Sequence, residues 1–183
     1  MIVREAAVHS ELLLVRHRAG DARALPELVA LWEKPLLYYL RRLLSSEEDA
    51  WDALQETWVR VVRELGGVRD GRALPAWLYI VARNSAFSLR RRRRPTERLP
   101  EAGEEDELAA AEPEPSLAGF DPLDVHRALA RLPLAQREAL TLHFLEGFGV
   151  AEIGVITGTA EGTIKSRLHY ARLALRKLLE GGA

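Results

Sequence analysis

The chain has 183 residues, which is enough for one large or two small domains, and nearly half of them are hydrophobic. It contains no cysteine, which excludes disulfides, thiolate metal sites and cysteine nucleophiles and is compatible with a reducing cytosol. No apolar run approaches the roughly 20 residues needed to cross a bilayer. The residues before Glu11 have no long apolar core, so they do not read as a secretory signal.

The net charge of −1 hides a strong asymmetry along the chain. Residues 95–122 contain five prolines, one arginine and nine carboxylates, a charge of −8, so the rest of the chain carries +7. Apart from residues 104–111, which have a helix-like composition, this segment is typical of a flexible linker. The sequence therefore predicts two basic bodies that flank an acidic connector.

The first body begins with helical patterns at 8–18 and 22–44, separated by Gly20 and Asp21. Asp21 is a suitable N-cap for the second of these helices. Pro35 lies inside that second pattern, where a proline ring removes a hydrogen bond, so we expect a kink or a break there.

A third helix is predicted to start at Ser46, its N-cap, and to run to about Leu65, where Gly66 and Gly67 end it. Its outward face carries four acidic or amide side chains: Asp49, Asp52, Gln55 and Glu56. Two interpretations stay open for this face. It is either an ordinary solvated surface or a docking surface for a basic partner helix.

A loop over residues 68–74, with Arg69 and Arg72, is predicted to precede a fourth helix over residues 75–94. That helix ends in five consecutive arginines, residues 90–94, which suit the binding of phosphates but also occur as solubilising tails. Aromatic, amide and cationic groups accompany the arginines on the same helix: Trp77, Tyr79, Arg83 and Asn84. Such interleaving suits single-stranded bases, which stack on ring faces.

The second body is predicted to contain helices at 124–132 and 134–145, and Gly147 ends the latter. Two more helices follow around a tight turn at Gly158, which caps the first of them because glycine tolerates the left-handed conformation. No alternating, strand-like run occurs anywhere in the sequence. The predicted fold class is therefore all-α: two small helical domains on an acidic flexible linker, the second with a helix-turn-helix.

The last helix has an apolar stripe and an opposite face of small, polar or cationic groups. At 100° per residue the helical wheel places these groups outward: Gly162, Lys165, Ser166, His169, Tyr170 and Arg176. In a helix-turn-helix such a face enters the major groove of DNA. A solvated face is equally compatible with this hairpin alone.

Several stretches together resemble one family, the extracytoplasmic-function (ECF) sigma factors of the bacterial sigma-70 family. They are Asp49 to Trp58, Ala76 to Asn84 with the arginine run, Ala128 to Pro133 with Gln136 to Glu138, and Glu161 to Leu168. Four motifs in the family's order make the resemblance specific. It implies a region 2 domain over residues 1–94, a linker over 95–122 and a region 4 domain over 123–183.

The resemblance also implies partners and site residues. Asp49, Asp52, Gln55 and Glu56 would bind the β′ clamp helices of core RNA polymerase, and region 4 would meet the β flap. The minus-ten promoter element would be bound by Arg69, Arg72, Trp77, Tyr79, Arg83, Asn84, Arg90 and Arg91. The minus-thirty-five element would be bound by Thr163, Lys165, Ser166, Arg167, His169 and Tyr170.

The family also implies an anti-sigma factor as a further partner, a cytoplasmic location, no cofactor and no small-molecule substrate. Four residues depart from its pattern: Gly149 stands in place of a Ser or Thr cap, Gly154 in place of an alanine, Trp51 in place of a small or acidic residue, and Pro75 in place of a polar one. Glycine is an acceptable N-cap, and at position 154 it allows close helix contact.

Two other classes of function fit the sequence less well. A stand-alone LuxR-like regulator has a similar helix-turn-helix, but the basic first body lacks the α/β pattern of a sensor domain. An enzyme is disfavoured because the five histidines are scattered without metal-ligand spacing and no glycine-rich phosphate loop follows a strand.

Overall fold

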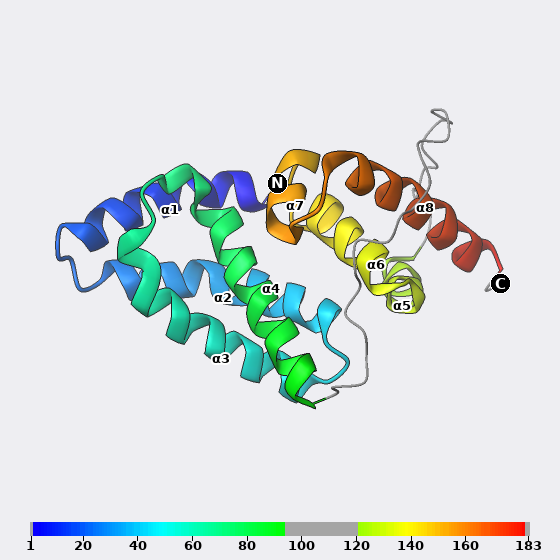
Figure 1. Cartoon of the computed structure of the whole chain (residues 1–183), viewed down its shortest axis with the longest axis horizontal. Helices are drawn as coiled ribbons and strands as arrows, with labels where there is room; N and C mark the ends of the chain where they lie inside the picture. Colours follow the sequence, from blue (N-terminus) through cyan, green and yellow to red (C-terminus); the bar gives the residue numbers. More distant parts are fainter. Residues whose placement is uncertain (1, 94–120, 182–183) are drawn as a thin grey trace.

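A computed structural model describes residues 2–93 and 121–181, and every regular element within them is helical (Figure 1). The predicted linker lies outside the described residues except for Asp121 and Pro122, and so does Arg94. The predicted all-α class is confirmed.

The helices form two regions that lie side by side in Figure 1. The front region, residues 2–93, contains α1 (Ile2–Arg18), α2 (Ala24–Leu43), α3 (Glu47–Glu64), η1 (Leu65–Gly67), η2 (Gly71–Ala73) and α4 (Leu74–Arg93). The rear region, residues 121–181, contains α5 (Pro122–Arg131), α6 (Leu134–Leu140), the π-helical turn η3 (Thr141–Leu145), α7 (Val150–Thr157) and α8 (Glu161–Glu180).

The helix boundaries of the front region follow local sequence signals at Ser46 but not at Asp21. α2 begins at Ala24 with Arg23 as its N-cap and no side-chain cap hydrogen bond, so the predicted Asp21 N-cap is wrong, and Asp21 Oδ1 accepts a hydrogen bond from the Arg23 amide instead. The hydroxyl of Ser46 accepts a hydrogen bond from the Asp49 amide at 3.0 Å, which confirms the predicted N-cap of α3. α2, however, continues through Pro35, so the break that was one of the expected outcomes there does not occur. Trp32, one turn before Pro35, and Leu36, directly after it, are fully buried, and their packing outweighs the cost of about 3 kcal/mol that a proline inside a helix carries.

The helix-turn-helix of α7 and α8 turns where glycine was predicted to allow it. Gly158 has φ +67°, the left-handed conformation of a C-cap, and Gly149 is the N-cap of α7. A Cβ on Gly154 would lie 2.9 Å from the Thr159 carbonyl oxygen, because the chain turns back closely over that position. The backbone conformation at position 158 and the lack of space at position 154 therefore both favour glycine.

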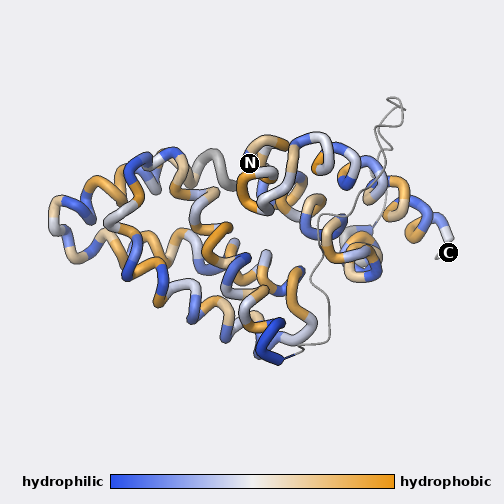
Figure 2. Tube along the Cα trace, viewed as in Figure 1, coloured by the Kyte–Doolittle hydropathy of each residue, from blue (hydrophilic) through white to orange (hydrophobic). Residues whose placement is uncertain are grey.

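The two regions share one continuous hydrophobic core. α4 packs against α7, and α2 packs against α6. The aromatic ring of Tyr79 on α4 is the centre of this junction: it lies 6.2 Å from the Trp32 ring, 5.0 Å from that of Tyr39 and 4.9 Å from that of Phe148 in the rear region. Figure 2 shows hydrophobic stretches in the helices of both regions and a strongly hydrophilic end on α4.

Candidate nucleic-acid and protein interfaces

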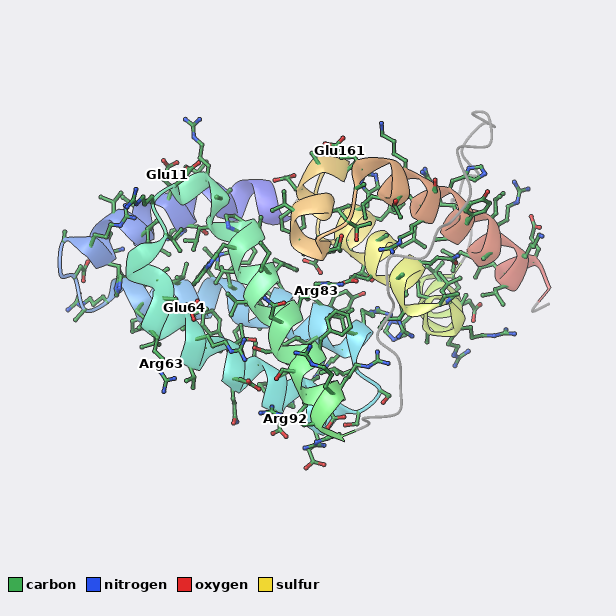
Figure 3. The ribbon with its side chains drawn as sticks, in the orientation of Figure 1. Glu11, Arg63, Glu64, Arg83, Arg92 and Glu161 are labelled. Carbon is green, nitrogen blue, oxygen red and sulfur yellow. The ribbon has the colours of Figure 1, made fainter. Side chains whose placement is uncertain are left out.

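The acidic face of α3 lies beside the arginine end of α4. Arg93 contacts both Asp49 and Asp52, the latter at 2.7 Å, while Arg92 reaches Glu56 at 2.7 Å (Figure 3 labels Arg92). All these arginine side chains are substantially exposed, so each pair contributes about 1 kcal/mol or less. A partner that competes for these carboxylates can displace the arginines at small cost.

Gln55 is the remaining member of the predicted α3 set, and it is exposed. The structure therefore brings all four predicted residues onto one side of α3. Their roles in polymerase binding stay a prediction.

The loop before α4 is held against α1. Gly71 approaches α1 so closely that a Cβ there would lie 2.6 Å from the Glu11 side chain. Arg18 donates hydrogen bonds to the carbonyls of Val68 and Arg69, and Asp70 accepts one from the Arg72 amide at 2.9 Å. This anchoring leaves the side chains of Arg69 and Arg72 exposed.

The predicted residues on α4 divide into two groups. Asn84 and Arg91 are exposed, Trp77 is half-buried, and Arg90 donates to the Leu43 carbonyl at 3.4 Å. Tyr79, in contrast, is fully buried at the junction of the two regions. In this arrangement the Tyr79 ring has no access to DNA, so a DNA contact by Tyr79 requires the regions to separate.

Buried carboxylates of the rear region hold the polar groups of α4. Glu138, only 1% exposed, accepts hydrogen bonds at 2.8 Å from Tyr39 Oη and from Arg83 Nε. Figure 3 places Arg83 between α4 and the rear region. Tyr79 Oη donates to Glu146, which is 3% exposed. Two predicted minus-ten residues, Tyr79 and Arg83, are thus engaged within the chain.

Burial sets the protonation of these groups. Burial raises the pKa of Glu146 to about 7, while the Tyr79 hydrogen bond and the charge of Arg42 oppose that shift. Burial and then the neighbouring Glu146 carboxylate raise the pKa of Tyr79. Burial, followed by the charge of Glu138, also raises the pKa of Tyr39. Both tyrosines are therefore neutral hydrogen-bond donors at physiological pH.

The predicted reading face of α8 is partly accessible. Lys165 is exposed, and Thr163, His169 and Tyr170 are half-buried, with the His169 and Tyr170 rings in an edge-to-face contact at 5.3 Å. The outward placement of Ser166 from the helical wheel is wrong, because this residue is 7% exposed and its hydroxyl donates to the Gly162 carbonyl at 3.2 Å.

Arg167, also named for minus-thirty-five binding, is 5% exposed and donates to Thr159 Oγ1 at 3.4 Å. The reason for both placements is that α5, α6 and α7 all pack against α8. The buried sector of α8 is consequently wider than its single apolar stripe. Whether Ser166 and Arg167 contact DNA stays a prediction.

Sequence reasoning missed the roles of Glu138 and Glu146. A signal for Glu138 was present, because Leu134, Glu138 and Leu142 recur at steps of four and so share a helix side that the two leucines mark as buried. No comparable signal identifies Tyr39 or Arg83 as its partners, since they lie 99 and 55 residues away along the chain.

Among residues 2–93 and 121–181, no three His, Asp or Glu side chains are grouped so that they could hold a metal ion. None of the described helices has the length and apolarity that a membrane span requires.

Comparison with known proteins identifies both regions. Residues 28–96 match the family model for sigma-70 region 2, and residues 123–175 match that for sigma-70, region 4. The chain is 34% identical to the ECF RNA polymerase sigma factor SigM of Mycobacterium tuberculosis over 167 residues, 91% of this chain and 83% of SigM. It is 35% identical to the ECF sigma factor SigF of Caulobacter vibrioides over 164 residues, 89% of each chain.

Solved structures agree with these matches. The sigma factor RpoE of Bartonella quintana, solved in complex with the anti-sigma factor NepR, superposes with a TM-score of 0.66 at 29% identity, covering 85% of this chain and 96% of RpoE. CnrH, solved with the cytosolic domain of CnrY, shares the fold with a TM-score of 0.69 at 23% identity, covering 95% of this chain and 99% of CnrH.

These matches do not favour a stand-alone LuxR-like regulator, because both sigma regions occur in the family's order on one chain. Sigma factors are transcription initiation factors, which direct promoter-specific transcription. The chain belongs to the extracytoplasmic-function sigma factors of the sigma-70 family.

Proposed function

We propose that this sigma factor binds core RNA polymerase through the acidic face of α3 and reads promoter DNA at two separate places. The observation that carries the proposal is the pairing of a carboxylate-rich face on the front region with an exposed Lys165 beside the half-buried His169 and Tyr170 on α8 of the rear region. Asp49, Asp52, Gln55 and Glu56 form the polymerase-binding face, which would meet the β′ clamp helices. Asp49, Asp52 and Glu56 are held by exposed arginines that a partner can replace.

The minus-ten element is proposed to meet the loop before α4 and α4 itself. Arg69 and Arg72 are exposed on a loop fixed against α1, and Asn84 and Arg91 are exposed on α4. Trp77, Tyr79, Arg83 and Arg90 complete the proposed set. The half-buried Trp77 ring, together with the exposed amide and arginine groups, would offset the few kcal/mol needed to unstack a base.

The minus-thirty-five element is proposed to meet the N-terminal half of α8. Lys165, His169 and Tyr170 supply a cation and two rings there, and the helix N-terminus favours phosphate. Thr163, Ser166 and Arg167 complete this set. Because Ser166 and Arg167 are buried, we assign them to holding α8 in position as well.

The contact between the regions keeps Tyr79 and Arg83 away from DNA. We propose that residues 1–94, 95–122 and 123–183 act as a region 2 domain, a linker and a region 4 domain, and that the two domains separate when both promoter elements are bound. A protein that keeps them together would silence the factor. The complex of the similar RpoE with an anti-sigma factor supports such a partner here.

The β flap of polymerase is the proposed second contact of the rear region. The factor is proposed to act in the cytoplasm, where core polymerase and promoter DNA are found. It would have no catalytic activity, cofactor or small-molecule substrate of its own.

Run-off transcription with purified core polymerase on a promoter library tests this function. Asp52→Arg should weaken core binding, while Lys165→Ala should spare core binding and reduce promoter binding. Matched controls lie on the same helices: Glu64→Arg on α3 and Lys177→Ala on α8, both exposed and twelve residues further along. If Asp52→Arg and Lys165→Ala both bind core and DNA as the parent does, the assignment of roles is wrong.

A further inference from the structure

A cavity lined by arginines lies where the two regions meet. One part, of about 410 Å³, is lined by residues of α2, the following turn, α5 and α6, including Arg41, Arg42, His126 and Arg137. A second part, of about 230 Å³, is lined by Arg90, Arg93 and Arg137, and both parts share Leu44 and Ser45. We call the two together the arginine cavity.

The carboxylates that line this cavity pair with Arg41 and Arg93, and not with Arg42 or Arg137. Glu47 pairs with Arg41 and Asp49 pairs with Arg93, so both are already engaged. Within residues 2–93 and 121–181, no carboxylate forms a direct ion pair with Arg42 or Arg137, although the charge of Arg42 does act on Glu146. Arg42, 5% exposed, instead contacts the Tyr38 hydroxyl, and it lies 2.6 Å from the Nδ1 atom of His126. A buried guanidinium without a counter-charge is unfavourable unless an anion compensates it.

One of the donor atoms of Arg137 also lacks a partner in the part of the chain that the structure describes. Its Nη1 donates to the Ala130 carbonyl at 2.9 Å, but its Nε is buried and has no hydrogen-bond partner among the described residues. Burial lowers the pKa of Arg137, and the charges of Arg90 and Arg42 lower it further. Burial, followed by the charge of Arg42, also lowers the pKa of His126. These groups repel one another's charges, and an anion between them would relieve that repulsion.

The shape and chemistry select the class of ligand. The cavity is too small for a helix or a duplex but large enough for a compact anion with several charges. Guanidinium groups present planar pairs of N–H donors that match phosphate oxygens. Arg42 and Arg137 belong to different regions, so one anion can bridge them.

We propose that the arginine cavity binds a compact oligophosphate, either free triphosphate or the triphosphate chain of a nucleotide, as an effector that is not consumed. The bound anion holds the front and rear regions together. This proposal does not depend on which residues bind polymerase or promoter DNA.

Isothermal titration of the full chain with sodium triphosphate, at fixed ionic strength, tests the proposal. We expect saturable binding of one triphosphate per chain, weakened at least tenfold by Arg42→Gln and by Arg137→Gln. The matched control is Arg127→Gln, an exposed arginine of α5 outside the cavity, which should bind as the parent does. A thermal unfolding midpoint that rises with triphosphate in the parent, but not in Arg137→Gln, would support the bridge.

Titration with ATP distinguishes the two sources of the phosphate chain. Affinity equal to that of triphosphate supports recognition of the phosphates alone, and tighter binding of ATP supports a nucleotide. If the glutamine variants fail to fold by circular dichroism, Arg42→Lys and Arg137→Lys keep the charge but lose the paired donors, and each should bind at least threefold more weakly.

Four results would overturn the proposal. The first is no saturable binding by the parent, and the second is an equal loss in Arg127→Gln and Arg137→Gln. The third is displacement of triphosphate by short duplex DNA equally in the parent and in Arg137→Gln, which would indicate a general nucleic-acid surface. Unchanged affinity in both lysine variants would also overturn it.

Discussion

The front and rear regions present their proposed DNA-binding groups in opposite ways. On α8 of the rear region, Lys165 is exposed and His169 and Tyr170 are partly so. On α4 of the front region, Tyr79 is fully buried and Arg83 is paired with Glu138. The rear face can therefore meet DNA in the arrangement seen here, whereas two of the front residues need the regions to part. Each of the following predictions tests that difference.

The largest effect is expected from removing the aromatic side chain at the junction. Phe148 is 1% exposed and its ring lies 4.9 Å from that of Tyr79, so Phe148→Ala should lower the free energy of unfolding by about 3–5 kcal/mol. Denaturant unfolding measures this. The control is Phe144→Ala, in which the replaced ring is 49% exposed, and its loss should be below about 1 kcal/mol. Equal losses would contradict a junction core.

Breaking the polar contact should open the molecule. Glu138→Ala leaves Tyr39 and Arg83 without their acceptor, which should disfavour the closed arrangement by about 2–5 kcal/mol. Because the chain has no cysteine, single cysteines at Val62 and Lys177 can carry a fluorophore pair that reports the distance between regions. We expect this distance to increase in Glu138→Ala. It should stay constant in the control Glu180→Ala, which removes an exposed ion pair with Arg176 on α8. An unchanged distance in Glu138→Ala would show that the Glu138 hydrogen bonds do not hold the two regions together.

The closed arrangement should weaken as pH rises. Burial raises the pKa of Glu146 to about 7 from an ordinary value of 4.5, so between these values the folded chain holds a proton that the unfolded chain has lost. The free energy of unfolding therefore falls from pH 4.5 to pH 7, by at most about 3 kcal/mol from this group, and changes no further above that.

Unfolding of the parent and of Glu146→Gln at pH 5 and pH 8 isolates this contribution, because other titrating groups cancel in the comparison. The glutamine keeps a hydrogen-bonding partner for Tyr79 but carries no charge. We expect the variant to lose less stability between the two pH values than the parent. The same loss in both proteins would show that Glu146 titrates normally.

The smallest effect concerns the turn that sets α8. Gly154→Ala places a Cβ 2.9 Å from the Thr159 carbonyl oxygen, so its gain in helix propensity is outweighed and a net loss of about 1 kcal/mol is expected. Gly162→Ala meets open space and should stabilise α8 by up to about 1 kcal/mol. Thermal unfolding of both variants gives the comparison, and a stabilised Gly154→Ala protein would show that the turn relaxes freely.

Local signals predicted much of this protein. The Ser46 cap, the glycines of the helix-turn-helix and the helical periodicity depend on neighbours a few residues apart, and the structure confirms them. The helical wheel failed at Ser166 because a wheel assumes one buried stripe, while three helices pack on α8. The sequence pattern likewise did not predict that α2 would continue through Pro35, where buried neighbours support the helix.

The sequence by itself determined the helices, the caps at Ser46 and Gly158 and the family, because these follow from spacing and residue type along a short stretch of chain. Only the tertiary structure decided that Tyr79 and Arg83 would meet Glu146 and Glu138, and that Arg42 and Arg137 would line one cavity. Those contacts join residues tens of positions apart. Their protonation and pairing depend on burial, which exists only after the two regions have packed together.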